Sequence, residues 1–347
     1  MNLQIAFLLG QEGVTSGAIY ALLALCMVLV FTVTRVLLVP QGEFVTFGAM
    51  TMAALQANQP AVLAWLLLGL ALLRALVRAW GALRRRPDAE PLGGADAAYV
   101  VHALLMLAIP RLLPGEGWPA ALQLLYTLAL IAPMGPLLYD LCFKPIAEAH
   151  SLVLLISAIA LHVALVGLSL WMFGAEGART QPLLDEVWEL GGVRVNGQAL
   201  CVVAATGVLI VLLYAYFERS LSGKALRATA IHRFGAQLMG ISPTGAGRTT
   251  FAIAALIGAL SGALIAPVTT LYYDSGFIIS LKGFVGAVVG GLVSYPAGAL
   301  GALAVGLIES YSTFWASAYK EVIVFTLILP ILLWRSLAAG HHEEDRA

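Results

Sequence analysis

The sequence predicts an all-α polytopic membrane protein with about 9–11 transmembrane helices, given that one crossing takes about 20 apolar residues. Of its 347 residues, 61% are hydrophobic and only 11% are Asp, Glu, Lys or Arg. Soluble domains carry about 25% charged residues. The apolar residues also gather in long runs separated by short polar loops. Composition therefore argues against a soluble enzyme, a disordered chain and a secreted disulfide scaffold.

The apolar runs define the expected spans. In chain order they cover 13–38, 42–57, 61–83, 97–113, 118–143, 151–173, 199–217, 249–271, 277–293, 297–314 and 322–337. The second run is short and rich in Gly, Ala and Met, so it either crosses or forms a broken or re-entrant helix, and the short run 277–293 has the same two options. Pro133 and Pro136 are expected to kink the fifth span.

Three polar segments interrupt a single transmembrane domain, 1–347. Residues 84–96 are expected to form an inserted, Gly/Pro-rich cytoplasmic linker. In 174–198, two short β-branched or aromatic runs flank Gly191-Gly192, a pattern that predicts a small β-hairpin. Residues 218–248 form a basic loop.

The basic residues orient the chain. With the N-terminus outside and every span crossing, most of the 19 Lys and Arg residues fall on the inner side, as the positive-inside rule requires. This places 174–198 outside the cytoplasm, and 218–248 and the C-terminus inside it.

No catalytic motif is present. The chain contains neither HExxH nor GxxxxGK[ST], and no His follows Ser261 until the C-terminal tail. We therefore expect no enzyme activity and no cofactor on this chain. The net charge of zero gives no attraction to nucleic acid.

Ionisable residues at membrane depth are candidates for function. Glu43 either begins a helix, where the helix dipole favours it, or lines a pathway. Glu309 either makes a helix-to-helix hydrogen bond or lines a pathway. Lys282 is expected to extend outward to the interface, and Asp140 to lie near the inner end of its span.

The basic loop predicts one cytoplasmic helix. Leu226, Ala230, Phe234 and Leu238 recur every four residues, with Ile231 beside them, which indicates a helix over 225–239 with one apolar stripe. Gly240 is placed to end it. The helix either lies on anionic lipid or docks into a soluble partner.

Several segments together resemble a known family. They are GKALRATA (223–230), LMGI (238–241), TTF (249–251), LIGALSGA (256–263), GFVGAVVGGL (283–292), YPAG (295–298), GAIYAL (17–22), QGEF (41–44), KP (144–145) and LLISAI (154–159). These segments are similar to those of Liv-type branched-chain amino acid ABC transporter permeases.

The resemblance implies a permease subunit of an ABC importer in the bacterial inner membrane. Its expected partners are a second related permease, two ATP-binding subunits that hold ATP and Mg, a periplasmic substrate-binding protein and membrane lipid. The residues expected to couple it to the ATPase are Gly223, Lys224, Ala225, Leu226, Arg227, Ala230, Arg233, Phe234, Leu238 and Gly240. Those expected on the translocation path are Gly42, Glu43, Gly286, Gly290 and Glu309.

Two departures and two alternatives remain. Ile231, His232 and Phe234 stand where the family usually places acidic or amide residues, and 61–119 is long enough for one extra helix pair. The substrate is expected to be a branched-chain or related small amino acid, with urea, short amides or aromatic acids as alternatives. The competing class is a stand-alone secondary transporter or channel.

Overall fold

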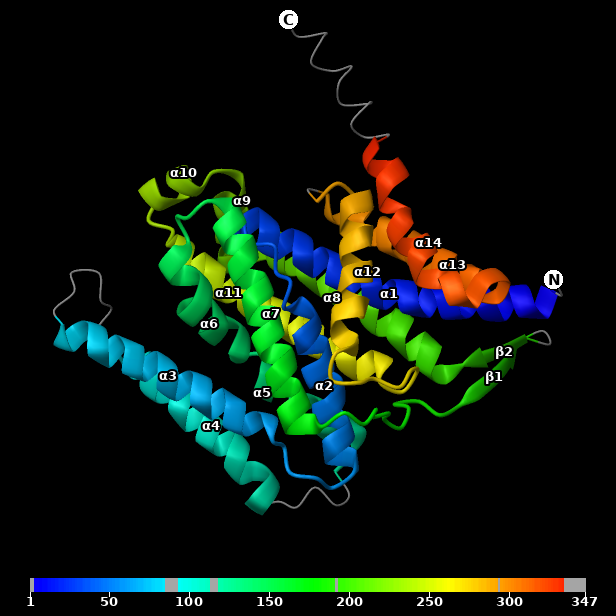
Figure 1. The fold of residues 1–347 in the computed structure, drawn as a ribbon, viewed down its shortest axis with the longest axis horizontal. Coiled ribbons are helices and arrows are strands. Elements are labelled where there is room, and N and C mark those ends of the chain that lie inside the picture. Colours follow the sequence, from blue (N-terminus) through cyan, green and yellow to red (C-terminus); the bar gives the residue numbers. More distant parts are fainter. Residues whose placement is uncertain (1–2, 85–92, 113–117, 191–192, 293, 334–347) are drawn as a thin grey trace, which may run out of the picture. The chain divides into compact units, whose positions relative to one another are not determined.

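A computed structural model describes residues 3–84, 93–112, 118–190, 193–292 and 294–333 (Figure 1). Most of the 84–96 linker, the Gly191-Gly192 turn and the polar tail lie outside the described residues. Eight helices in the described part are long and apolar enough to cross a membrane: Gln4–Thr34, Leu63–Leu83, Gly94–Leu112, Ala120–Ile146, Ser151–Phe173, Gly197–Arg219, Pro243–Ile265 and Tyr295–Leu333. The expected all-α polytopic fold is confirmed.

The chain packs as two compact units, each built from segments far apart in sequence. The first, the α2 unit, comprises 33–181 and 216–277. Its elements are α2 (Gln41–Gln56), α3 (Leu63–Leu83), α4 (Gly94–Leu112), α5 (Ala120–Ile131), α6 (Met134–Leu138), the π-helix η1 (Tyr139–Phe143), the 3-10 helix η2 (Lys144–Ile146), α7 (Ser151–Phe173), α9 (Leu221–Ile231), α10 (Arg233–Leu238) and α11 (Pro243–Ile265).

The second, the α1 unit, comprises 1–32, 182–215 and 278–347. Its elements are α1 (Leu3–Thr34), β1 (Val187–Leu190), β2 (Val193–Asn196), α8 (Gly197–Arg219), α12 (Ser275–Val289), α13 (Tyr295–Ala316), the 3-10 helix η3 (Ser317–Tyr319) and α14 (Lys320–Thr326). The strands β1 and β2 pair antiparallel, with Trp188 opposite Val195, which confirms the predicted hairpin.

Helix α2 is the buried centre of the α2 unit. Although it is only 16 residues long, nearly all of them are buried. Its backbone lies against that of α11 because glycines on both helices leave room. A Cβ at Gly48 would lie 2.7 Å from the Cα of Ala259, and one at Gly262 would lie 2.9 Å from the amide nitrogen of Ala49. The short, Gly-rich segment is therefore a core helix of this unit.

Prolines free two backbone carbonyls on α4 and α5, and side chains of the facing helix take both. Pro110 in α4 cannot donate to the carbonyl of Met106, and the hydroxyl of Tyr126 on α5 donates to it instead at 2.7 Å. Pro133 likewise leaves the carbonyl of Ala129 free, and Nε2 of His102 on α4 lies 2.9 Å from it. Such replacement is what a lipid environment demands of a broken helix.

Pro133 and Pro136 shape the end of α5. The expected kink is confirmed, because α5 ends at Ile131 and the chain continues through the short helix α6 into the π-helix η1. A π-turn inside a helical span re-aims the residues that it carries. Asp140 lies in this π-turn.

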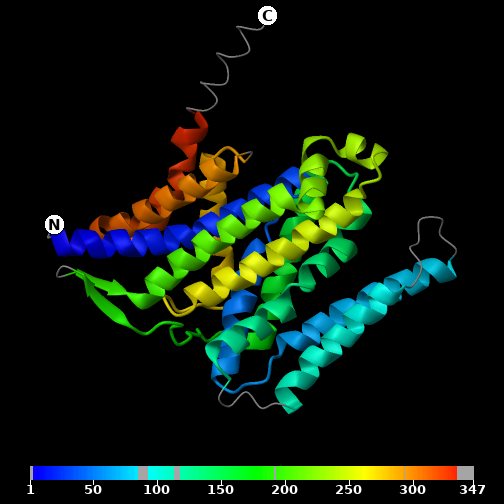
Figure 2. The same cartoon turned by 180° about the vertical axis from the view of Figure 1, so that it is seen from behind.

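Small residues also hold the α1 unit together. In α1, a Cβ at Gly13 or Gly17 would lie 2.9 Å from the Cα of Leu307 or Leu303 on α13. In α12, a Cβ at Gly286 would lie 2.5 Å from the Cα of Ala302, also on α13. The close helix packing that the glycine spacing indicates is therefore present, and Figure 2 shows α1 and α13 side by side.

We predict that Tyr126→Phe destabilises the protein by about 1 kcal/mol, the usual scale of an interhelical hydrogen bond in a membrane. The change removes only the hydroxyl, so the carbonyl of Met106 loses its donor. Denaturant-induced unfolding in detergent measures the effect. Tyr214→Phe, on an exposed face of α8, is the matched control. Equal stability of both variants would show that the carbonyl does not need this donor.

Candidate functional site

The basic loop folds as two short helices. The prediction of a single helix over 225–239 is wrong. The backbone at His232 has an extended conformation, with φ −148° and ψ 93°, and this interrupts the helix. His232 then caps α10: its Nδ1 accepts a hydrogen bond from the amide of Gly235 at 2.7 Å. Gly240, with φ +80°, ends the second helix as predicted. Ser242 and Pro243 then begin α11, six residues earlier than the apolar pattern indicates.

The break divides the expected apolar stripe between two faces. Leu226 is 1% exposed and packs against its own unit, and Ala236 on α10 is buried as well. Ala225 and Ala230 are half-buried. Four large apolar side chains point away from the unit: Ile231 (78% exposed), Phe234 (65%), Leu238 (73%) and Met239 (82%). We call these four the apolar cap.

The expected stripe accounts for most of this cap. Phe234 and Leu238 belong to the stripe and Ile231 lies beside it, whereas Met239 is not part of it. The signal for Met239 is His232, because a capping side chain there begins a second helix with a different phase.

The remaining coupling candidates hold the loop or lie at its surface. A Cβ at Gly223 would lie 2.8 Å from the Cα of Phe217, so this position needs glycine. Arg233 is half-buried, with its guanidinium near the carbonyl of Ala147. Arg227 makes an exposed ion pair with Glu218 at 2.9 Å, and Lys224 is exposed. The loop thus presents an apolar cap with basic residues beside it.

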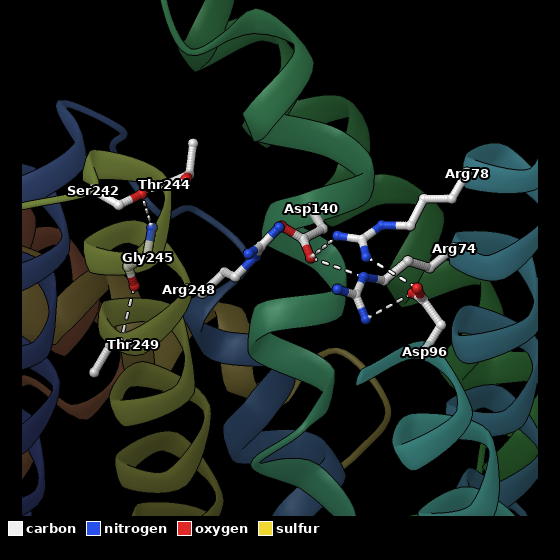
Figure 3. Close-up of polar contacts among 9 residues, drawn as sticks. All are labelled: Arg74, Arg78, Asp96, Asp140, Ser242, Thr244, Gly245, Arg248 and Thr249. Atoms are coloured by element: carbon white, nitrogen blue, oxygen red, sulfur yellow. Dashed lines mark hydrogen bonds and ion pairs between the residues drawn. The ribbon is translucent and has the colours of Figure 1, made fainter. Parts of the chain in front are cut away.

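A buried ion cluster lies where this loop joins α11 (Figure 3). Asp140 accepts a hydrogen bond from Nε of Arg248 of α11 at 2.6 Å and forms an ion pair with Nε of Arg74 of α3 at 2.8 Å. Asp96 of α4 pairs with Arg74 at 3.2 Å and with Arg78 at 3.0 Å. Asp140, Asp96 and Arg74 are at most 5% exposed. We call these five residues the Asp140 cluster.

The cluster connects helices α3 and α4 to α11. The two helices run side by side (Figure 1), Asp96 on α4 pairs with Arg74 and Arg78 on α3, and both arginines pair with Asp140 in η1, which also pairs with Arg248. The sequence predicts the position of Asp140 near the end of its span but not its partners. Arg74 and Arg78, four residues apart on one helix face, are the pattern that could have indicated a buried carboxylate partner.

Glu43 is buried in the first turn of α2. It is 1% exposed, and its Oε1 accepts a hydrogen bond from Nδ1 of His162 on α7. The His162 ring stacks on Phe277, with centroids 4.4 Å apart. Within the described residues, the second oxygen, Oε2, has no hydrogen-bond donor. Gly42 packs against the backbone of Gly276, so this end of α2 is tightly enclosed.

The candidates of the α1 unit lie in helix contacts. Glu309 on α13 accepts from Lys282 at 2.5 Å and from the hydroxyl of Tyr20 at 2.7 Å. Lys282 is therefore not extended to the interface as expected: it is 6% exposed because a carboxylate pairs with it inside the unit. Gly286 and Gly290 on α12 lie in close contact with α13, Gly286 against Ala302 and Gly290 against Gly298.

Comparison with known proteins identifies the family. A sequence model of the family described as branched-chain amino acid transport system / permease component matches residues 11–332. The chain belongs to this family. It is thus a multi-pass permease subunit of an inner-membrane ABC import system and not itself a catalytic subunit.

The individual relatives share about a quarter of their residues with this chain. The high-affinity branched-chain amino acid transport system permease protein LivH of Escherichia coli K12 is 26% identical over 70% of this chain and 80% of its own length. LivH of Salmonella typhimurium has the same identity and coverage. BraD of Pseudomonas aeruginosa, described in the same words, is 27% identical over 56% of this chain and 65% of its own length. No solved structure matches.

We predict that Asp140→Asn destabilises the α2 unit by about 3 kcal/mol, because removing one member of a buried ion group leaves its partners unpaired. Here Arg74 and Arg248 would lose their ion pairs with Asp140, while Arg74 and Arg78 would keep those with Asp96. Equilibrium unfolding in detergent measures the loss. Glu218→Gln, which breaks only the exposed pair with Arg227, is the control and should cost less than about 1 kcal/mol.

A double change tests the cluster itself. Adding Arg248→Gln to Asp140→Asn removes a cation that has lost its carboxylate, so the double variant should cost less than the sum of the two single changes. Strict additivity would mean that the two side chains do not interact in the folded protein.

Proposed function

We propose that this chain is the membrane-spanning subunit of an ATP-driven importer for branched-chain or related small amino acids. The observation that carries the proposal is the apolar cap on a basic loop in a chain of this permease family. The relatives that match it are permeases of branched-chain amino acid transport systems. ATP and Mg bind to two partner ATPase subunits, a second related permease completes the pore, and a periplasmic binding protein delivers the substrate.

The apolar cap is the proposed contact with one ATPase subunit. Four large apolar side chains on two short helices are costly to leave in water, and burying a Phe side chain alone gains about 1.5–3 kcal/mol. Leu226 on α9 and Ala236 on α10 are buried behind the cap and fix it to its own unit. A groove on a soluble partner would then receive a preformed surface, with Lys224 and Arg227 at its rim.

A movement of the cap would be transmitted through α11 to α2, at the centre of the α2 unit. Only Met239 to Ser242 separate the second loop helix from α11. Helix α11 in turn packs backbone to backbone on α2, which carries Glu43. Packed helices move as rigid bodies rather than deforming. Closure of the ATPases would therefore shift α11 and α2 together and alter access to Glu43.

We predict that Phe234→Ala weakens retention of the ATPase subunits and uncouples ATP hydrolysis from uptake. Truncating a central aromatic anchor at an interface costs about 2 kcal/mol or more. Copurification and substrate-stimulated ATPase activity in proteoliposomes measure the two effects. Gln237→Ala, exposed on the same helix, is the control. If the loop instead lies on lipid, Phe234→Ala will leave both measurements at wild-type levels, and the coupling assignment fails.

Glu43 is the proposed polar contact on the translocation path. Its Oε2 is an acceptor without a donor among the described residues, and an amino-acid ammonium group is a suitable donor. We predict that Glu43→Gln lowers uptake at least about tenfold, the factor that 1.4 kcal/mol gives, while the assembled complex stays intact. Size-exclusion chromatography and uptake are measured on the same preparation. Unchanged uptake with reduced thermal stability would leave Glu43 as a helix-start residue only.

The proposed orientation has the N-terminus and the β1–β2 hairpin outside the cytoplasm and the α9–α10 loop inside it. The hairpin would then face the binding protein. We predict that a cysteine at Asn196 reacts with an impermeant thiol reagent on intact spheroplasts, whereas one at Gln237 reacts only after lysis. The reverse pattern would invert the topology.

The substrate is tested on the assembled importer. Uptake by proteoliposomes supplied with the binding protein should be highest for leucine, isoleucine and valine in a panel that includes urea, short amides and aromatic acids. Preferred uptake of another member would reassign the substrate and leave the docking assignment untouched.

A further inference from the structure

We propose that the α3–α4 helix pair carries a binding site for one anionic phospholipid. Arg111 holds the phosphodiester of the headgroup, and a groove beside Trp65 holds an acyl chain. The site is independent of the loop and path residues above.

The groove consists of two adjoining cavities that share Trp65, Leu107 and Arg111. The first, of about 280 Å³, also has polar lining from the α2–α3 connection, at Asn58 and Gln59. The second, of about 320 Å³, is almost entirely apolar, with Leu68, Leu104, Ala108 and Leu112 along its walls. Because three residues line both cavities, the groove passes from a polar end to an apolar helix face, as a phospholipid does.

Arg111 supplies the complementary charge. It is exposed in the last turn of α4, and its guanidinium lies 5.7 Å from the centroid of the Trp65 ring. Within the part of the chain that the structure describes, no carboxylate pairs with it. Its planar donor fork suits two oxygens of a phosphodiester. The amides of Asn58 and Gln59, both exposed at the same end, can donate to headgroup hydroxyls.

The surroundings favour lipid over a soluble anion. Helices α3 and α4 are long and apolar enough to cross a membrane, and only 17% of each membrane-span window is buried. Trp65 and Arg111 are also the residue types that anchor span ends at the membrane interface. A lipid with a net negative headgroup is preferred because it brings no cation of its own to compete with Arg111.

The simpler alternative is that Arg111 only stabilises the end of α4, where the helix dipole favours a cation. On that alternative the groove holds whichever lipid is nearby, with no preference for charge. The two readings therefore differ in lipid selectivity rather than in whether lipid is present.

Fluorescence quenching distinguishes them. The full-length protein is placed in nanodiscs of phosphatidylcholine containing a small fraction of either phosphatidylglycerol or phosphatidylcholine with brominated acyl chains. The difference between wild type and Trp65→Phe gives the quenching of Trp65. We expect brominated phosphatidylglycerol to quench at lower mole fraction, and Arg111→Gln to raise that mole fraction about fivefold, the factor for one basic residue at an anionic surface.

Arg219→Gln, at an exposed arginine of α8, is the matched control and should leave Trp65 quenching unchanged. Native mass spectrometry gives a second measurement, in which wild type but not Arg111→Gln retains one phosphatidylglycerol. Equal quenching by the two brominated lipids in wild type, or an Arg111→Gln variant that behaves as wild type, would overturn the proposal and leave only annular lipid.

Discussion

The backbone contact between α2 and α11 is the interaction on which the rest of the α2 unit depends. Glycines at 48 and 262 remove the side chains that would hold these helices apart, so α2 is buried almost completely despite its length of 16 residues. Close approach gains dispersion over many atom pairs, which is the main attraction available between apolar helices in lipid. It also fixes Glu43 relative to the start of α11. The candidate path residue and the candidate docking loop therefore belong to one rigid assembly.

Within each unit, several polar groups inside the membrane helices are held by partners on neighbouring helices. Tyr126 and His102 replace the amide donors that Pro110 and Pro133 lack. Lys282 and Tyr20 hold Glu309, and three arginines surround the carboxylates of Asp140 and Asp96. Each group would be costly alone in a medium of low dielectric constant. These pairings also explain why the extra α3–α4 pair is integrated with its unit, since its charges and its freed carbonyl both need partners on neighbouring elements.

The loop that carries the apolar cap is the part of this unit proposed to contact an ATPase subunit. Its buried side chains fix it to its own unit, and its exposed ones are available to a partner. The Asp140 cluster lies at the junction of that loop with α11 and reaches the α3–α4 pair.

The sequence by itself determined the fold class, the family and the position of most helices, because these follow from local properties. Runs of apolar residues, glycine spacing, Gly240 as a helix end and the pattern around 187–195 are all readable within a few residues. Only the tertiary structure decided the partners of Glu43, Lys282, Asp140 and Arg111, and the break at His232 after which Met239 points outward. An ionisable group in an apolar helix must be paired, but its partner is far away in sequence and is selected by how the helices pack. Four-residue spacing likewise shows that a face exists, whereas packing decides which face is buried and which one is left for a partner.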